Sequence, residues 1–187
     1  MAATATLDIR DLITGNGPFG PVEVKAIVES LGADPQAYRD LRDAVRELES
    51  TPDRSPAAAV RLGVGQRLLG RARDALETLQ AADGGALALF HQGLAHAVEG
   101  LHDKAGELFT AARKAGYEAA ACVAATAESL RAAGRHDDAR SHLDSLGDDA
   151  GGTSADYWAA KAAVLAETGS PPMEIGDALE RALTADP

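Results

Sequence analysis

The 187-residue sequence has few aromatic residues, a single cysteine, no long apolar run and fewer basic than acidic residues. Aromatic residues make up 4% of the chain and alanine is abundant, which predicts a mostly helical protein whose helices approach closely. The lone Cys122 excludes an internal disulfide, and its alanine-rich surroundings predict a buried, inert thiol. No stretch reaches the roughly 18 apolar residues of a membrane span, and the first residues do not resemble a secretory signal. We therefore expect a cytoplasmic protein with no membrane partner.

The charge balance excludes one further class of partner. Lys and Arg number 18 against 29 Asp and Glu, which gives a formal net charge of −11. Proteins that bind phosphate backbones need a basic face, and the overall charge opposes such binding. We expect no nucleic-acid partner.

Three segments repeat one pattern of small and large residues: "LLGRARDALETLQAA", "VEGLHDKAGELFTAA" and "AAGRHDDARSHLDSL". Each segment contains a turn glycine. A small residue precedes the quoted segment, seven positions before this glycine. An alanine lies five positions after the glycine and a large apolar residue nine positions after it. These offsets place the apolar face of one helix against a second helix, and glycine can adopt the positive φ that ends the first helix. The pattern predicts helical hairpins with turns at Gly70, Gly100 and Gly134.

Two further copies of the pattern flank these three. A fourth turn is expected at Gly169, where Leu179 and Ala182 fit the pattern if the turn holds one extra residue. A weaker copy has its turn glycine at Gly32. Asp34 and Pro35 follow as the N-cap and first residue of the next helix.

At these positions the sequence resembles the tetratricopeptide repeat family, whose repeat is about 34 residues long. The residues that carry the resemblance are Trp158, Ala162, Leu165, Ala182 and Pro187 in the last copy and Gly93, Ala105, Phe109 and Ala112 in the second. The resemblance implies an all-α fold, a right-handed superhelix or α-solenoid of helix-turn-helix repeats. It covers about four repeats in residues 56–187 and a degenerate helical hairpin in residues 21–50. Residues 1–20 are expected to form a flexible N-terminal segment.

The resemblance also implies where a partner would bind. Repeats of this family stack so that their first helices line an inner surface, on which a peptide or partner helix lies. The expected partner-binding residues are Val60, Val64, Arg67, Leu68, Leu87, Phe90, Leu94, Val98, Glu128 and Arg131. The same residues could instead pack against neighbouring helices, an alternative that the sequence leaves open. The Lys and Asn residues with which one subclass clamps chaperone tails are absent from these positions, so an adaptor of that kind is not expected.

No catalytic, metal or cofactor site is expected. "GRHDDARSHL" holds His136 and His142, but six residues turn a helix by about 240°, so the two histidines cannot share one metal ion. "TGNGPFG" has the spacing of a dinucleotide-binding loop, but no parallel-sheet pattern accompanies it.

We therefore interpret the sequence as a protein–protein interaction scaffold or adaptor and not an enzyme. Two alternatives stay open: a regulatory or targeting domain of a longer enzyme, and a self-assembling structural protein. The apolar residues of the last hairpin have no following helix to cover them. This predicts either that the chain is a fragment of a longer protein or that it forms a homo-oligomer through its uncapped C-terminal repeat.

Overall fold

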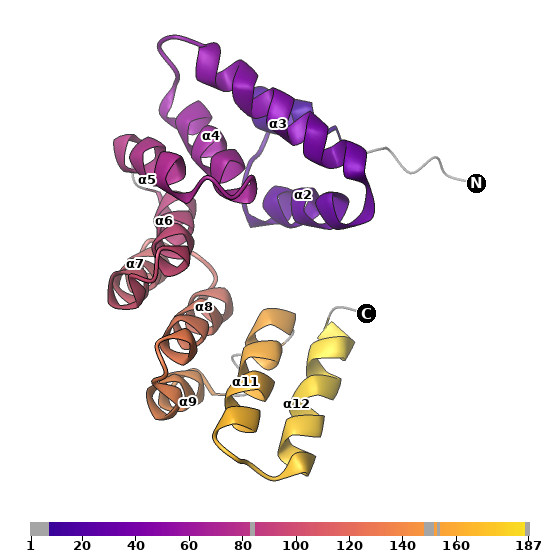
Figure 1. The fold of residues 1–187 in the computed structure, drawn as a ribbon, viewed down its shortest axis with the longest axis vertical. Coiled ribbons are helices and arrows are strands. Elements are labelled where there is room, and N and C mark those ends of the chain that lie inside the picture. Colours follow the sequence, from indigo (N-terminus) through magenta and orange to yellow (C-terminus); the bar gives the residue numbers. More distant parts are fainter. Residues whose placement is uncertain (1–7, 83–84, 148–151, 153, 186–187) are drawn as a thin grey trace, which may run out of the picture. The chain divides into compact units, whose positions relative to one another are not determined.

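The protein is all-α in a computed structural model, which describes residues 8–82, 85–147, 152 and 154–185 (Figure 1). The helices are α1 Ile9–Thr14, α2 Pro21–Ala33, α3 Pro35–Ser50, α4 Pro56–Leu68, α5 Ala72–Ala81, α6 Ala86–Val98, α7 His102–Lys114, α8 Ala119–Ala132, α9 His136–Asp144, α11 Ala155–Glu167 and α12 Pro172–Ala185. None of these helices is both long enough and apolar enough to cross a bilayer. Pro187, which contributes to the family resemblance, lies outside the described residues.

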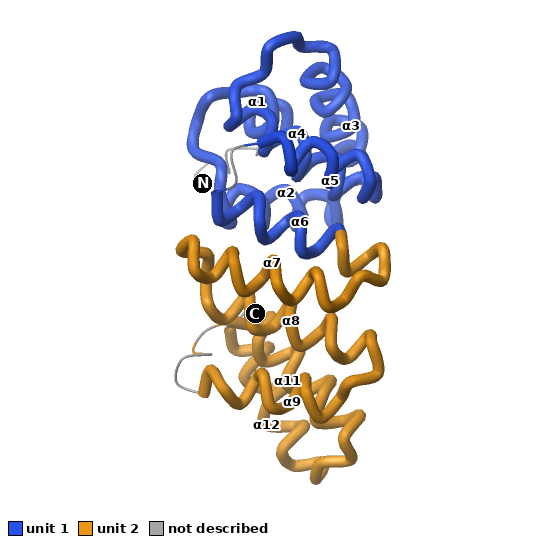
Figure 2. Tube along the Cα trace, turned by 90° about the vertical axis from the view of Figure 1, so that its left-hand side faces the viewer, with its two compact units in different colours: residues 1–95 blue, residues 96–187 orange. Residues whose placement is uncertain are grey.

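The chain divides into two compact units, residues 1–95 and 96–187 (Figure 2). The first unit contains the N-terminal core, built by α1 to α4 from Ile9, Ile13, Ile27, Ala37, Leu41, Ala44, Val45, Leu48 and Leu62. The second unit has a core that α8, α9, α11 and α12 build around Ala127, Leu143, Tyr157 and Trp158. Each unit therefore buries its own apolar faces.

The predicted hairpin turns are confirmed. Gly70, Gly100, Gly134 and Gly169 have φ values of 77°, 76°, 75° and 72°, and each lies between the two helices of a hairpin. A side chain at such a φ would clash with the backbone, which is why glycine recurs there. The helices of α4/α5, α8/α9 and α11/α12 pack as hairpins within the units, and Gly100 lies in the turn between α6 and α7.

Small residues let the two helices of a hairpin touch. A Cβ built on Gly63 of α4 would lie 2.5 Å from Cγ of Leu79 on α5, closer than two carbon atoms can approach. These are the residues that the pattern placed seven before and nine after the turn glycine. In the third hairpin Ala127 and Leu143 take the corresponding places, and both are buried. The spacing therefore identified true contact positions.

Two details of the predicted pattern are wrong. Gly32 lies inside α2, and the break between α2 and α3 falls at Asp34, whose carboxylate caps α3 by accepting the Gln36 amide at 2.8 Å. In the last hairpin Ala178 is buried and Leu179 is 49% exposed. Ala178 lies nine residues after Gly169, so the buried position has the same spacing as in the other hairpins, and the turn holds no extra residue. Leu179 is the next residue and faces outward.

The segment expected to be flexible contains a helix in its described part. Asp8 caps α1 by accepting the Asp11 amide at 3.1 Å, and Ile9 and Ile13 of α1 are buried in the N-terminal core. Two apolar residues four positions apart give this short helix one apolar face. The predicted division at residue 20 stays a prediction.

Trp158 is buried, as the family resemblance predicted. It is 4% exposed in α11, its indole nitrogen donates to the Gly152 carbonyl at 3.0 Å, and the Arg181 guanidinium of α12 lies 4.5 Å from its ring centre. Tyr157 meets it edge-on, with ring centres 5.2 Å apart. The indole thus fills the space between the two helices of the last hairpin.

We predict that Trp158→Ala lowers the free energy of unfolding by about 3–5 kcal/mol, because it leaves a cavity among residues that cannot close around it. Urea titration followed by circular dichroism measures this change. The control Ala159→Gln alters the neighbouring exposed position of α11 and should change stability little. A loss below about 1 kcal/mol for Trp158→Ala would show that the indole does not fill this space.

A polar contact joins the first two hairpins. Nε of Arg67 on α4 donates to Nδ1 of the fully buried His91 on α6, at 2.7 Å. Burial, and then the charge of Arg67, lower the pKa of His91 well below its ordinary value. His91 is therefore neutral in the folded protein at neutral pH.

This pKa shift predicts destabilisation by mild acid. As the pH falls through the ordinary histidine value of about 6.5, the unfolded chain takes up a proton that folded His91 does not, so unfolding becomes easier. We expect the melting temperature to fall between pH 7.5 and pH 5.5, and to fall less in His91→Asn. The asparagine can still accept from Arg67 but does not titrate, and both proteins should change little between pH 7.5 and pH 8.5. Equal acid losses in the two proteins would remove His91 as the cause.

Candidate partner-binding surface

α4 carries the first group of predicted binding residues on a face that is mostly covered. Arg61, Val64, Gly65 and Leu68 follow one another at helical spacing and form one stripe, here called the α4 stripe. Val64 is fully buried, and Leu68 packs against the N-terminal core. Val60, beside the stripe, packs on a small cluster of Ala75, Leu79 and Ala88. These apolar residues of α4 therefore serve packing.

Arg61 fastens the N-terminal segment onto the α4 stripe. It is 5% exposed, and its Nη1 and Nη2 donate to the carbonyls of Leu12 and Gly17. The Phe19 ring centre lies 4.9 Å from the guanidinium carbon. Burial lowers the pKa of Arg61, and the charges of Asp11 and Glu23 oppose that shift. These contacts have no local signal in the sequence, because they join positions 49 and 44 residues apart.

α6 carries the second group, and its apolar residues are partly accessible. Leu87, Phe90 and Leu94 are partly buried and lie within about 60° of one another around the helix; we call them the α6 strip. The Phe90 ring meets His91 edge-on, with centres 5.8 Å apart. Val98, at the end of α6 and in the second unit, is 75% exposed. Arg67 belongs to the first unit and is engaged by His91.

Glu128 and Arg131 belong to a charged cluster of the second unit. Nε and Nη2 of Arg131 donate to one oxygen of Glu128, at 3.0 and 2.8 Å, and Nη1 donates to Glu167 at 2.7 Å. The hydrogen bonds from these two carboxylates raise the pKa of Arg131. Nδ1 of His136 lies 2.9 Å from the other Glu167 oxygen. Arg131 thus joins α8 to α11 and is already paired with two carboxylates.

Most of the "GRHDDARSHL" stretch lies in α9, and Cys122 lies in α8. Within residues 8–82, 85–147, 152 and 154–185, no group of three or more His, Cys, Asp or Glu side chains is placed to hold a metal ion. Burial, and then Arg113, lower the pKa of His142. Cys122 is buried as predicted, and burial raises the pKa of its thiol to about 11, which keeps it protonated and unreactive.

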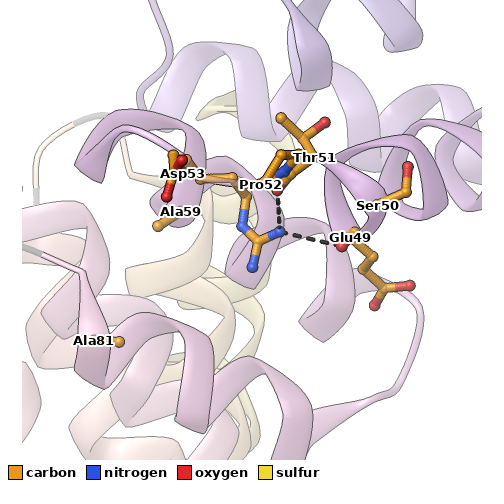
Figure 3. A pocket seen from close by; sticks show the side chains of 8 residues that line it. Glu49, Ser50, Thr51, Pro52, Asp53, Ala59 and Ala81 are labelled. Carbon is orange, nitrogen blue, oxygen red and sulfur yellow. Dashed lines mark hydrogen bonds between the residues drawn. The ribbon is translucent and has the colours of Figure 1, made fainter.

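A hollow of about 440 Å³ lies beside the end of α3 (Figure 3). It is lined by Glu49, Ser50, Thr51, Pro52, Asp53, Arg54, Ala59 and Ala81. Nη1 of Arg54 donates to the carbonyls of Leu48, Glu49 and Thr51, so it caps the last turn of α3. The Glu49 carboxylate accepts from Arg71 at 2.7 Å and Gln66 at 3.0 Å. The charges at this hollow satisfy groups of the chain itself, which indicates a structural role.

Solved structures resemble this chain over most of its length. A crystal structure of MamA is 16% identical with a TM-score of 0.58, and the match covers 91% of this chain and 96% of that one. A second MamA structure is 17% identical with a TM-score of 0.60, covering 88% and 93% of the two chains. The Cut9–Hcn1 hetero-tetramer of APC/C contains a chain that is 20% identical with a TM-score of 0.61, covering 88% of this chain and 32% of that one.

Comparison of the sequence alone finds no relative of the chain. No family model matches the chain, and no curated protein matches it. The identities are too low to transfer an activity or a partner, but the coverage and TM-scores establish the architecture. The chain has an all-α solenoid fold built from tetratricopeptide-like helical hairpins.

Proposed function

We propose that the chain is a tetratricopeptide repeat protein that acts as a non-catalytic scaffold or adaptor and binds a peptide or partner helix through its first unit. The repeated hairpins and the likeness to solenoid structures support this proposal. One of those structures is a hetero-tetramer, so this architecture takes part in protein assembly elsewhere. We also propose that the protein is cytoplasmic. It has neither a membrane nor a nucleic acid as a partner in this proposal.

The observation that carries the proposal is the α6 strip. Leu87, Phe90 and Leu94 keep part of their apolar surface accessible along one face of a single helix. Such a strip is complementary to the apolar face of an amphipathic helix, whose anchor residues recur every three or four positions. Arg67 and Arg131, two of the predicted partner-binding residues, are engaged by His91 and by two glutamates. The α6 strip therefore offers apolar contact, and both guanidinium groups already have hydrogen-bond partners inside the chain.

A second proposal concerns self-association through the last hairpin. Met173, Leu179 and Leu183 of α12 are 75%, 49% and 71% exposed. Large apolar residues exposed on one helix favour contact with another apolar surface. We propose that a second copy of the chain supplies that surface.

The α6 strip predicts a specific loss of binding in Phe90→Ala. Central aromatic anchors often contribute about 2 kcal/mol or more to binding, so partner capture from the native host should weaken by roughly thirtyfold. Quantitative affinity purification with the intact chain as bait measures this, and thermal melting of the same proteins measures stability. Leu101→Ala, which removes a half-exposed leucine outside the strip, is the matched control.

The paired measurements separate binding from packing. Lost capture with an unchanged melting temperature supports a binding role for Phe90. A large drop in melting temperature would instead assign Phe90 to the core. If neither quantity changes, the α6 strip is not the binding surface.

The proposed self-association predicts a concentration-dependent mass. Sedimentation equilibrium should show oligomers of the intact chain, and Leu179→Glu with Leu183→Glu should return it to the monomer, because charge in an apolar contact is costly. Val22→Glu changes an exposed apolar residue of the first unit and serves as the control. A chain that stays monomeric up to about 100 μM, well above micromolar dissociation constants, would exclude the homo-oligomer.

A further inference from the structure

The α4 stripe, which contains two predicted partner-binding residues, is covered in part by α3, through Val45 and Leu41, and in part by the chain's own N-terminal segment. A Cβ on Gly65 would lie 3.8 Å from Cδ1 of Ile13, and Leu68 packs on the core that contains Ile13. Phe19 packs against the same core and lies over the Arg61 guanidinium. We call residues 9–20 the N-terminal latch. The latch lies where the family resemblance predicted a ligand.

Arg61 holds the latch through neutral acceptors. In the described part of the chain no carboxylate oxygen forms an ion pair with its guanidinium, which donates to the Leu12 and Gly17 carbonyls. A buried guanidinium is more stable beside a carboxylate, because the two planar groups form parallel charge-assisted hydrogen bonds. Asp11, which opposes the desolvation of Arg61 from a distance, belongs to the latch itself. If the latch leaves, Arg61 loses both its carbonyl partners and this nearby negative charge.

The latch has the features of a segment that opens without unfolding the unit. α1 has six residues, fewer than a helix needs to persist without tertiary contacts. Three glycines lie between α1 and α2, and a Cβ on Gly17 would meet no atom within 4 Å, so packing does not fix that position. At the surface, the latch is joined to α3 by the Arg10–Glu47 ion pair at 2.7 Å, whose side chains are 67% and 45% exposed. Exposed ion pairs contribute little stability.

We propose that the N-terminal latch is a built-in competitor for the α4 stripe, and that a partner carrying a carboxylate beside an aromatic or large apolar side chain displaces it. The carboxylate takes the places of the Leu12 and Gly17 carbonyls on Arg61, and the apolar group takes the place of Phe19. This inference rests on the proposed scaffold function. The inference adds that Arg61 recognises a carboxylate of the partner. Arg67 and Arg131 keep their partners within the chain.

Hydrogen exchange of the intact chain tests the latch. The reporter amides are those of Leu12 and Gly15, which donate to Asp8 and Asp11 in α1, and the reference amide is that of Leu69, which donates to Gly65 at the end of α4. In Phe19→Ala and Arg61→Lys the reporters should exchange about tenfold faster, the effect expected for loss of one such contact, while Leu69 keeps its rate. Arg10→Gln, which breaks only the exposed pair, is the control. If the exchange rates of Leu12 and Gly15 change by the same factor as that of Leu69 in every variant, the proposal that the latch opens separately is wrong.

Phenylacetate tests the chemistry of the displacing group, because it carries a carboxylate beside an aromatic ring. In Phe19→Ala it should produce saturable shifts of the Arg61 Nε–H and Leu68 resonances, whereas benzyl alcohol at the same concentration should not. Arg61→Gln should abolish the shifts. Absence of saturation, or equal shifts with benzyl alcohol, would exclude carboxylate recognition at Arg61. These readouts involve no natural partner, so they can fail or succeed independently of the Phe90→Ala capture experiment.

Discussion

Close approach of helices through small residues is the constraint on which the rest of this protein depends. Gly63 leaves no room for a Cβ against Leu79, and a Cβ on Gly65 would lie 2.6 Å from Val45. α4 is therefore pressed against α5 on one side and α3 on another. A chain with 4% aromatic residues cannot fill wide gaps between helices, so it closes them by bringing backbones together. A larger residue at Gly63 would force α4 and α5 apart, and one at Gly65 would force α4 and α3 apart.

Polar contacts fix how successive hairpins meet. The Tyr157 hydroxyl donates to the Leu143 carbonyl at 3.1 Å and joins the third hairpin to the fourth, as Arg131 does through Glu167. In the first unit, Arg67 and His91 join α4 to α6. Alanine-rich faces are smooth and permit sliding, whereas a buried hydrogen bond has one geometry. Because a repeat contacts only its neighbours, each such bond sets one junction of its unit.

The hairpins could be predicted from the sequence because their signal is local. A turn glycine with partners seven before and nine after it defines two helix faces within one short window, as Gly70 does with Gly63 and Leu79. The N-terminal latch could not be predicted in this way. Its main tie, from Arg61 to the Leu12 carbonyl, crosses 49 residues and uses a backbone acceptor that every residue type provides. Neither the residue types nor their spacing indicates such a contact.

Periodicity also could not separate a binding residue from a packing residue. Val64 and Leu94 both lie six residues before the turn glycine that follows their helix, yet Val64 is fully buried and Leu94 keeps part of its surface exposed. Both need to be apolar, the one to exclude water within the fold and the other to attract an apolar partner, so the sequence pattern is the same. The difference arises from what covers each helix, and α4 lies under both α3 and the chain's own N-terminal latch. A partner of the first unit therefore has two routes, direct contact with the α6 strip or competition with the latch for the α4 stripe.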